Sequence, residues 1–284
     1  MIPQNFTYQA PKTLEEALAL LADGTAKPLA GGMSLIPLMK LRLAAPERIV
    51  DLGRIPGLNY IREEDGKIRI GAMTTHYEIE TSPLLRARCP LLATTAAHIG
   101  DMQVRNVGTI GGSLAHADPA ADYPAALLAL EAEVRLVRAG GERTLPIRDF
   151  FVDVFTTALE PGEIVREVVV PVEAPGTGTS YQKVAHPASG FAVVGIAARV
   201  RRGDGKIALA RLGVTGLASK PFRADAAEKR LEGTDGAETD LRAAAAAVTE
   251  GVEANSDLYA SAEYRAHLAR VYAVRGLRSA LQAA

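Results

Sequence analysis

The distribution of apolar and polar residues predicts a helix near the start of the chain. Thr13 and Glu16 have the spacing of a capping box, in which the threonine side chain accepts the N–H of the third helical residue. Residues 17–21 then form an apolar run, and Gly24 stops it. We therefore expect the first helix to begin directly after Thr13.

A strand, a tight turn and a second helix are expected to follow. Residues 27–30 read as a short strand that runs directly into a pair of glycines. Ser34 is then expected to cap a helix over residues 35–40, because serine is a favoured N-cap residue. This order predicts a unit of strand, glycine turn and helix.

The middle of the chain mixes helix-like and strand-like patterns. Thr75 opens another capping box, and apolar residues continue at helical spacing to about Ile99. Asp118 precedes a proline and is expected to cap a helix that reaches Glu131. Residues 133–138 alternate as a half-buried strand does, and a glycine pair turns the chain back. We expect helices packed on a sheet here.

The last third of the chain is expected to form a small antiparallel sheet with helices. Prolines and glycines cluster in residues 171–178, where we place the main domain boundary. Residues 191–201 and 207–215 flank a Gly-Asp-Gly turn and predict a hairpin. Alanine-rich helices are expected near residues 225–231, 241–252 and 262–281.

Composition and charge narrow the functional classes. With 284 residues, 48% hydrophobic and 23% charged, the chain has the make-up of a folded globular protein. Lys and Arg (32) balance Asp and Glu (33), which argues against a nucleic-acid surface. Neither a secretion signal nor a membrane span is evident, so a cytoplasmic location is expected. The single cysteine, Cys89, reads as a buried apolar residue and excludes an internal disulfide and a self-contained iron–sulfur cluster.

Two glycine pairs carry the candidate chemistry. Residues 30–34, the first glycine segment, and residues 109–113, the second glycine segment, both end in serine. Glycines leave backbone N–H groups open to a pyrophosphate, and a helix start favours an anion. Each pair alone also fits a plain turn. Neither matches Gly-x-Gly-x-x-Gly or a Walker motif, so a nicotinamide site of that type and an ATP site are not indicated.

The residues that flank these segments resemble a known family. Residues 103–115, continuing through 118–122, resemble the flavin loop of the medium subunits of molybdenum hydroxylases. Residues 30–37 resemble the first flavin loop of the same family, which includes xanthine dehydrogenases and aerobic carbon monoxide dehydrogenases. Residues 181–183 and 186–189 match as well, so the likeness spans essentially the whole chain.

The resemblance implies an α+β fold. Its first part would be a two-lobed FAD-binding domain of the type found in vanillyl-alcohol oxidase and the CO dehydrogenase flavoprotein. A C-terminal α+β domain, with a small antiparallel sheet and helices, would follow. The implied boundaries are residues 1–54 for FAD-binding lobe 1, 55–175 for FAD-binding lobe 2 and 176–284 for the C-terminal domain.

The resemblance also implies noncovalent FAD and the residues that contact it. The two glycine segments would bind the diphosphate, Ile99 would border the isoalloxazine ring, and Asp122 would contact the ribose or adenine. Two further residues would approach the flavin from the C-terminal domain, Lys183 and Phe191. The implied contact residues are Ala30, Gly31, Gly32, Met33, Ser34, Leu35, Ile99, Thr109, Ile110, Gly111, Gly112, Ser113, Asp122, Lys183 and Phe191. Many relatives have histidine in place of Met33, so no ionisable role is assigned there.

Other readings stay open for several residues. Asp122 also fits a solvated acid at a helix start, and Lys183 fits a charge at a strand edge. Arg105 fits either phosphate steering or a surface contact. His116 fits a structural histidine or a neighbour of the flavin. The five histidines lack metal-binding spacing, so neither a metal site nor a catalytic residue is assigned.

The functional hypothesis is an electron-transfer flavoprotein subunit of a molybdenum hydroxylase-type oxidoreductase. By resemblance, electrons pass from a large subunit with the molybdenum cofactor, through two [2Fe-2S] clusters of a small subunit, to this FAD and then to an external acceptor. A dimer of heterotrimers, a heterohexamer, is expected.

The alternatives are a stand-alone FAD-dependent oxidoreductase, which would need a general base or acid, and a non-catalytic nucleotide-binding structural subunit. Carbon monoxide, purines, other N-heterocycles and aldehydes all stay open as substrates of the complex. Quinone, NAD and other molecules all stay open as the terminal electron acceptor. The oligomeric state of the isolated chain also stays open.

Overall fold

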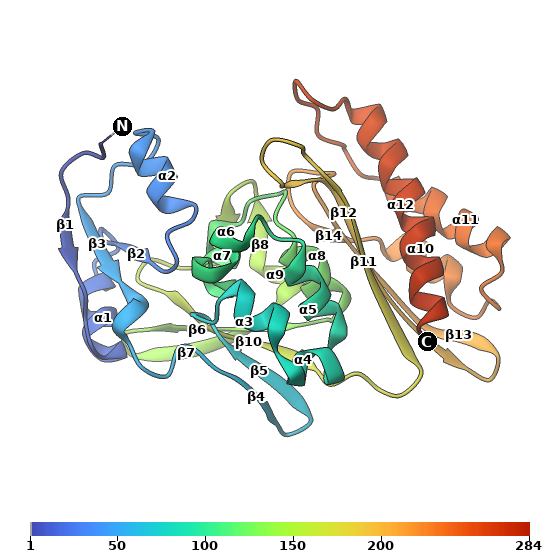
Figure 1. Ribbon diagram of the computed structural model, residues 1–284, viewed down its shortest axis with the longest axis horizontal. Helices are drawn as coiled ribbons and strands as arrows, with labels where there is room; N and C mark the ends of the chain where they lie inside the picture. The colour runs from blue at the N-terminus through green and yellow to red at the C-terminus, as the bar shows by residue number, and fades with distance from the viewer. Residues whose placement is uncertain (1) are drawn as a thin grey trace.

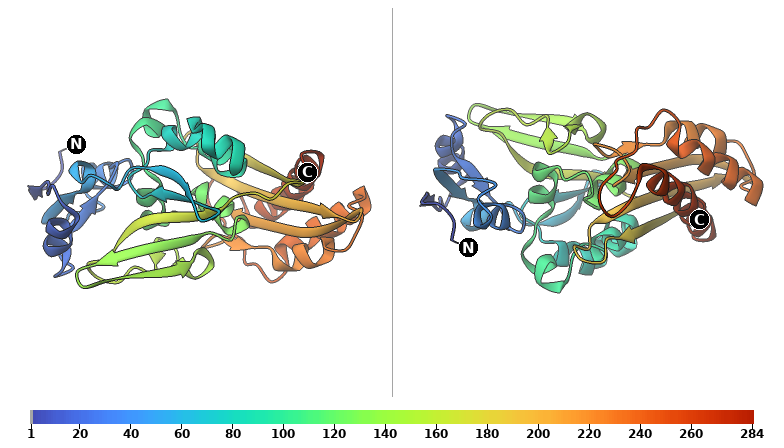
Figure 2. Two further views of the ribbon diagram at one scale, coloured as in Figure 1. Left: turned by 90° about the horizontal axis from the view of Figure 1, so that it is seen from below. Right: turned by 90° about the horizontal axis from the view of Figure 1, so that it is seen from above.

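Three sheets follow one another along the long axis of the molecule. We describe residues 2–284 in a computed structural model. The N-terminal sheet lies at one end, a larger sheet covered by helices lies in the centre, and a third sheet with its own helices lies at the other end (Figures 1 and 2). Helices and sheets are thus mixed, which confirms the predicted fold class. No helix in residues 2–284 has the length and apolar character that a membrane crossing requires.

The N-terminal sheet is parallel and has the strand order β1-β3-β2. The side chain of Thr13 accepts the N–H of Glu16 at 3.2 Å, so the predicted capped helix is confirmed. The elements are β1 Thr7–Gln9, α1 Leu14–Leu21, β2 Lys27–Leu29, α2 Leu35–Lys40, β3 Arg48–Asp51 and the 3₁₀ turn η1 Leu52–Arg54. The first glycine segment joins β2 to α2.

The central sheet is antiparallel, with the order β4-β5-β10-β6-β7. Its apolar face packs against several helices and forms the largest hydrophobic core of the described chain. The strands are β4 Ile61–Glu64, β5 Lys67–Gly71, β6 Glu133–Arg138, β7 Gly141–Pro146 and β10 Ile164–Pro171. A short helix and a two-stranded hairpin lie beside the sheet, α9 Ile147–Phe150, β8 Phe151–Asp153 and β9 Thr156–Thr157.

The helical run after Thr75 is divided into three helices rather than one. The predicted capping box is present, with the Thr75 side chain accepting the N–H of Glu78. Pro83 and Pro90 then each begin a new helix, because proline suits a first helical position and disrupts a continuing one. The three helices are α3 His76–Thr81, α4 Pro83–Arg88 and α5 Pro90–Ala97.

The predicted helix from Asp118 to Glu131 is also wrong at its start. Asp118 closes a turn instead, since its carboxylate accepts the N–H of Ala120 at 2.8 Å. The helix begins later, with Pro124 in its first turn. The second glycine segment enters a helix of its own rather than an open loop. The helices of this region are α6 Met102–Val107, α7 Ile110–His116 and α8 Tyr123–Ala129.

The C-terminal sheet is antiparallel, with the order β11-β12-β13-β14. The predicted hairpin is confirmed, because Asp204 and Gly205 both have positive φ in the tight turn between β12 and β13. The strands are β11 Thr177–Ala185, β12 Ala192–Gly203, β13 Lys206–Thr215 and β14 Phe222–Arg223. The helices are α10 Asp225–Leu231, α11 Glu238–Ala246, the 3₁₀ turn η2 Ala247–Thr249 and α12 Ala262–Gln282.

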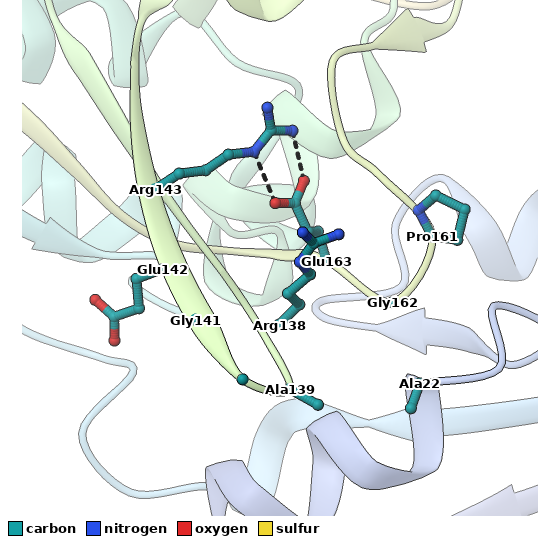
Figure 3. A pocket seen from close by; sticks show the side chains of 10 residues that line it. Ala22, Arg138, Ala139, Gly141, Glu142, Arg143, Pro161, Gly162 and Glu163 are labelled. Carbon is teal, nitrogen blue, oxygen red and sulfur yellow. Dashed lines mark hydrogen bonds and ion pairs between the residues drawn. The ribbon is translucent and has the colours of Figure 1, made fainter.

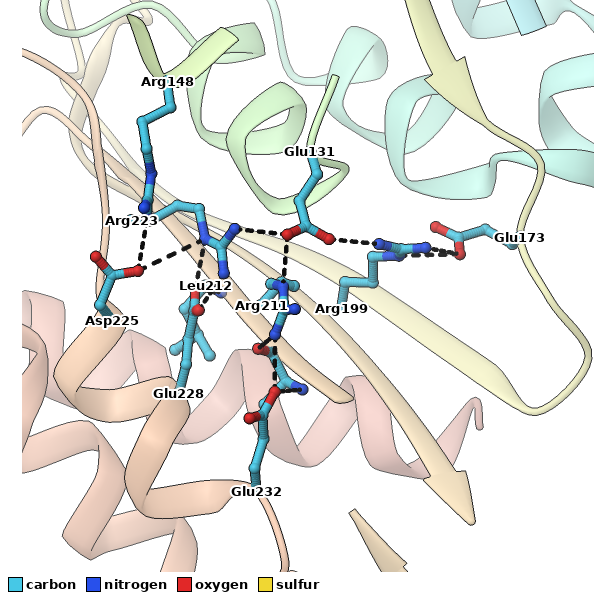
Figure 4. A network of polar contacts seen from close by, with 11 residues as sticks. Glu131, Arg148, Glu173, Arg199, Arg211, Leu212, Arg223, Asp225, Glu228 and Glu232 are labelled. Carbon is cyan, nitrogen blue, oxygen red and sulfur yellow. Dashed lines mark hydrogen bonds and ion pairs between the residues drawn. The ribbon is translucent and has the colours of Figure 1, made fainter. Parts of the chain in front are cut away.

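The C-terminal sheet is fixed to the central helices by close packing and by charge. Strand β13 passes so near α8 that a Cβ at Gly213 would lie 1.9 Å from the carbonyl oxygen of Ala125. Beside this contact, Glu131 pairs with Arg211 at 3.0 Å and Arg223 at 2.9 Å (Figure 4). Burial opposes ionisation, yet hydrogen bonds from these arginines hold the pKa of Glu131 below its usual value. A charged network therefore joins the two parts.

Candidate functional site

The two glycine segments touch each other. A Cβ at Gly31 would lie 2.1 Å from the carbonyl oxygen of Val107, two residues before the second segment. A Cβ at Gly112 would lie 3.4 Å from the Cβ of Ala30. Only a residue without a side chain fits at Gly31, so its glycine is required by the approach of the two segments. The turn after β2 and the start of α7 thus form one site.

The first segment presents unused hydrogen-bond donors. Gly32 has φ +75°, a left-handed conformation that glycine adopts without strain. Within residues 2–284, the backbone N–H groups of residues 31–34 have no hydrogen-bond acceptor. Ser34 occupies the N-cap position of α2 as predicted, but it has helical rather than extended backbone angles and its side chain makes no cap bond. Its hydroxyl and the four amides are free to meet an anion.

The second segment differs from the expectation of bare amides. The N–H of Ile110 donates to Thr74 O at 3.0 Å, and the N–H of Gly111 donates to Ala72 O at 2.9 Å. The side chain of Thr109 caps α7 by accepting the N–H of Gly112 at 3.1 Å. A Cβ at Gly111 would lie 2.5 Å from that of Ala72, so this glycine serves packing. The backbone of the second segment is therefore fixed by contacts within the protein.

A buried histidine packs against the start of the second segment. A Cβ at Gly108 would lie 2.6 Å from His76 Nε2, so the imidazole fills the space that this glycine leaves. The other ring nitrogen of His76 lies 3.2 Å from the hydroxyl of Tyr123. Burial, and to a lesser degree the charge of Arg105, lowers the pKa of His76 to about 4. The ring is therefore neutral at physiological pH.

A second group of predicted residues gathers around a buried ion pair. Lys183 lies 2.9 Å from Asp122, and both side chains are almost fully buried. Asp122 also accepts the hydroxyl of Tyr181 at 2.5 Å. The solvated-acid reading of Asp122 is therefore wrong, and Lys183, although it lies on the edge strand β11, is a buried charge rather than an exposed one. Burial raises the pKa of Asp122, while Lys183 and Tyr181 oppose that rise.

The backbone of residues 98–100 closes this second group. Lys183 donates to His98 O at 2.8 Å, which places it one residue from Ile99. Arg105 donates to the carbonyl oxygens of Ile99 and Gly100 at 3.1 and 3.2 Å, while its Nε pairs with Glu80 at 2.8 Å. Because its guanidinium is occupied in this way, Arg105 has a structural role, and phosphate steering is not supported.

Phe191 completes the second group from the β11–β12 connection. Its side chain is 42% exposed, and the adjacent Gly190 approaches Gly100. Helix α6 lies between the two groups, since it begins after Gly100 and ends before Gly108. Six helical residues span about 9 Å. The arrangement suits an elongated ligand, with an anionic part at the glycine segments and another part near the Asp122–Lys183 pair.

Sequence reasoning missed several members of the site. Tyr181, His98 and Gly108 make contacts described above but were not assigned roles. Tyr181 and Gly108 lie inside the runs that carried the family resemblance, so that signal was available.

Two other residues considered in the sequence lie away from these contacts. The ring of His116 packs 5.1 Å from that of Phe155. Cys89 is fully buried, as predicted, and burial raises the pKa of its thiol to about 12.

The hollows in the surface lie elsewhere. One, of about 450 Å³, is lined by the β6–β7 hairpin, the turn before β10 and the end of α1 (Figure 3). Its charges are already paired, with Arg143 and Glu163 2.7 Å apart. Another, of about 470 Å³, is lined by residues near Asn59 and Glu78. Neither of these two includes a predicted FAD residue, and the candidate site described above lies along α6 instead.

The unpaired donors of this surface and the mixed fold are compatible with a dinucleotide-binding protein. Residues 4–173 match the family of the FAD binding domain in molybdopterin dehydrogenase, and residues 179–280 match the CO dehydrogenase flavoprotein C-terminal domain. The chain therefore belongs to the family of FAD-binding medium subunits of molybdenum hydroxylases, and it is an FAD-binding oxidoreductase subunit. The predicted family and cofactor are confirmed.

Curated relatives of several activities match along the whole chain. The medium chain of carbon monoxide dehydrogenase from Hydrogenophaga pseudoflava is 41% identical over 282 residues, or 99% of this chain and 98% of that one. Subunit alpha of the 6-hydroxypseudooxynicotine dehydrogenase complex from Paenarthrobacter nicotinovorans is 40% identical, covering 100% and 97%. The glyceraldehyde dehydrogenase medium chain of Sulfolobus acidocaldarius is 36% identical, covering 98% and 99%.

Solved structures give the same result. A structure of carbon monoxide dehydrogenase from Hydrogenophaga pseudoflava, lacking the molybdenum-pyranopterin moiety of its cofactor, matches with a TM-score of 0.97 at 43% identity. Quinoline 2-oxidoreductase from Pseudomonas putida 86 matches with a TM-score of 0.94 at 34% identity. Each match covers 99% of both chains.

Proposed function

We propose that this chain is the electron-transfer subunit of a molybdenum hydroxylase complex, and that its bound FAD accepts electrons from [2Fe-2S] clusters of a partner and passes them to an external acceptor. The observation that carries the proposal is the likeness of the whole chain to medium subunits whose names give different substrates. A feature common to all of them is independent of the substrate. We propose that this common feature is electron transfer through FAD.

The chain's own thiol chemistry supports partner-held clusters. A [2Fe-2S] cluster of the common type takes four cysteine ligands, whereas this chain has Cys89 alone, fully buried. We therefore propose a small subunit with two such clusters and a large subunit with the molybdenum cofactor, assembled as a dimer of heterotrimers. The substrate would be bound by the large subunit.

We propose that FAD lies along α6, held by the residues that the resemblance assigned. The free amides of the first segment and the Ser34 hydroxyl would donate to the diphosphate. The second segment would lie on the other side of the diphosphate. Ile99, Lys183 and Phe191 would border the flavin. When bound, FAD supplies two-electron and one-electron redox chemistry, and the protein supplies its position and electrostatic surroundings.

The first experiment is an FAD titration of the purified chain, followed by absorbance and flavin fluorescence. We expect a yellow, one-to-one complex. Gly31→Ala should weaken it because the added methyl group separates the two segments, whereas Gly141→Ala is a matched control in an exposed turn with no atom within 4 Å of the added Cβ. A wild-type chain that binds no FAD would contradict the proposal and favour a structural subunit.

The second experiment tests the direction of electron flow. The FAD-loaded chain is mixed anaerobically with a chemically reduced iron–sulfur partner, and flavin bleaching is followed by stopped flow. We expect bleaching only when the partner is present. Bleaching of the isolated chain by carbon monoxide, an N-heterocycle or an aldehyde would instead identify a stand-alone oxidoreductase.

A further inference from the structure

The connection between β11 and β12, residues 186–191, is a closed turn. The N–H of His186 donates to Phe191 O, and the N–H of Gly190 donates to His186 O, both at 2.8 Å. Gly190 has φ +73°, which a residue with a side chain adopts only with strain. The turn lies against two other segments, because Gly190 approaches Gly100 and the N–H of Ala192 donates to Ala120 O at 3.2 Å.

The imidazole of His186 holds this turn from inside. Its Nδ1 accepts the backbone N–H of Ala188 at 3.2 Å and that of Ser189 at 3.4 Å. A ring nitrogen that accepts hydrogen bonds carries no proton, so the proton of the neutral ring is on Nε2. The ring packs on Tyr259, from the segment before α12, with centroids 4.4 Å apart and planes at 59°. His186 is thus fixed on two sides.

Phe191 depends on this turn for its position. The residue is 42% exposed, so its ring is only partly covered by the protein. Its backbone is held by the bond to His186 and by a 3.4 Å bond from its N–H to Ser189 Oγ. The next residue is anchored by a 3.2 Å bond to Ala120 O. Freedom in residues 187–190 would therefore loosen the bonds to His186 and Ser189 that hold the backbone of Phe191.

We propose that His186 is a positioning residue of the FAD site: by accepting two backbone amides at Nδ1, it fixes the turn that places Phe191 beside the flavin. Tyr259 supports the imidazole from the opposite side. This inference rests on the proposed function, which places Phe191 at the flavin. His186 itself touches no reacting atom.

The first test uses the chain without FAD. His186→Phe keeps an aromatic ring against Tyr259 but removes the acceptor, whereas His186→Asn keeps an acceptor oxygen near the position of Nδ1. We expect hydrogen exchange at the amides of Ala188 and Ser189 to become about three- to tenfold faster in His186→Phe, since each loses a hydrogen bond. His186→Asn should restore slow exchange. Unchanged exchange in His186→Phe would overturn the inference.

The second test uses the FAD-loaded chain and reports on the flavin. Iodide quenching of flavin fluorescence should increase in His186→Phe to nearly the value of Phe191→Ala, and His186→Asn should resemble the wild type. Faster exchange combined with wild-type quenching would overturn the positioning role. Failure of the wild-type chain to bind FAD would contradict the proposed function alone, because the exchange test does not use the cofactor.

Discussion

The two glycine segments look alike in the sequence, but they have different physical reasons for their glycines. In the first segment, Gly32 takes a left-handed conformation and four neighbouring amides stay without an acceptor. In the second segment, the amides of Ile110, Gly111 and Gly112 are bound to protein acceptors. One segment offers donors to a ligand, and the other is a scaffold against which the first is placed.

The difference teaches that a glycine pair can mark either a ligand contact or a packing contact. At Gly111 the absent side chain makes room for Ala72, and at Gly108 it makes room for His76. Changes in the second segment should therefore act mainly on stability, and changes in the first mainly on FAD affinity. The following predictions test that division, from the largest expected effect to the smallest.

The scaffold segment should depend on a neutral His76. The pKa of His76 is lowered from 6.5 to about 4, so the unfolded chain binds a proton between these values while the folded chain does not. Its contribution to the free energy of unfolding is complete above pH 6.5 and is lost as the pH falls towards 4, by about 3 kcal/mol in total. Urea unfolding between pH 7 and pH 4 measures this loss.

His76→Gln should flatten that part of the pH profile, whereas His267→Asn, at an exposed histidine, should leave it unchanged. If the stability of His76→Gln falls with pH as steeply as that of the wild type, other groups cause the acid sensitivity. FAD is omitted from both series, so that binding does not contribute to stability.

Gly111→Ala should destabilise the fold. Its Cβ would lie 2.5 Å from Ala72 Cβ and 2.8 Å from Ala72 O, and such overpacking costs about 1–3 kcal/mol. Gly276→Ala in α12 is the matched control, because its Cβ would meet Gln182 at an ordinary 3.5 Å. That change should be neutral or stabilising, as alanine favours a helix. Thermal unfolding without FAD measures both, and an unchanged Tm for Gly111→Ala would contradict the packing role.

Gly31→Ala should act on the ligand instead. The added Cβ would lie 2.1 Å from Val107 O, and the first segment can relieve this clash by moving away from the second. If the strain of about 1–3 kcal/mol appears in binding, the Kd for FAD rises about 5- to 150-fold. Fluorescence titration measures the change, with Gly141→Ala as control. A larger loss of stability than in Gly111→Ala would reverse the proposed division.

Two hydroxyl deletions should have the smallest effects and should still distinguish the two segments. Thr109→Ala removes the cap of α7 and should lower the free energy of unfolding by about 0.5–2 kcal/mol. Ser34→Ala removes a hydroxyl that caps nothing, so stability should stay unchanged while the Kd for FAD rises about two- to tenfold. Equal effects of both variants on stability would contradict the observed difference in capping.

Local signals in the sequence predicted local structure well. Thr13 and Thr75 cap their helices because both partners of the contact lie within three residues. Ser34 lacks the cap bond and Asp118 does not begin a helix, although both side chains suit a cap. The chain before Ser34 packs against Val107, and α8 begins near Pro124 rather than at Asp118. The domain boundaries after residues 54 and 175 stay predictions.

The candidate site could be predicted only in part. The glycine segments were visible as motifs, and the resemblance indicated Asp122 and Lys183. Their ion pair joins residues 61 positions apart, on α8's N-terminal side and on β11, which no periodicity in the sequence reveals. The unequal use of amides in the two segments depends on β5 and its following turn, and therefore required the structure.

The buried Cys89 has a practical consequence. Since its side chain is fully covered and the pKa of its thiol is raised to about 12, it should react with maleimide dyes only when the chain unfolds. The folded wild-type chain should therefore take up almost no thiol-reactive label. A cysteine introduced at exposed Ala188, whose side chain makes no hydrogen bond, would be the one reactive thiol of the folded protein. A spin label or fluorophore there would report directly on the distance between the β11–β12 turn and bound FAD.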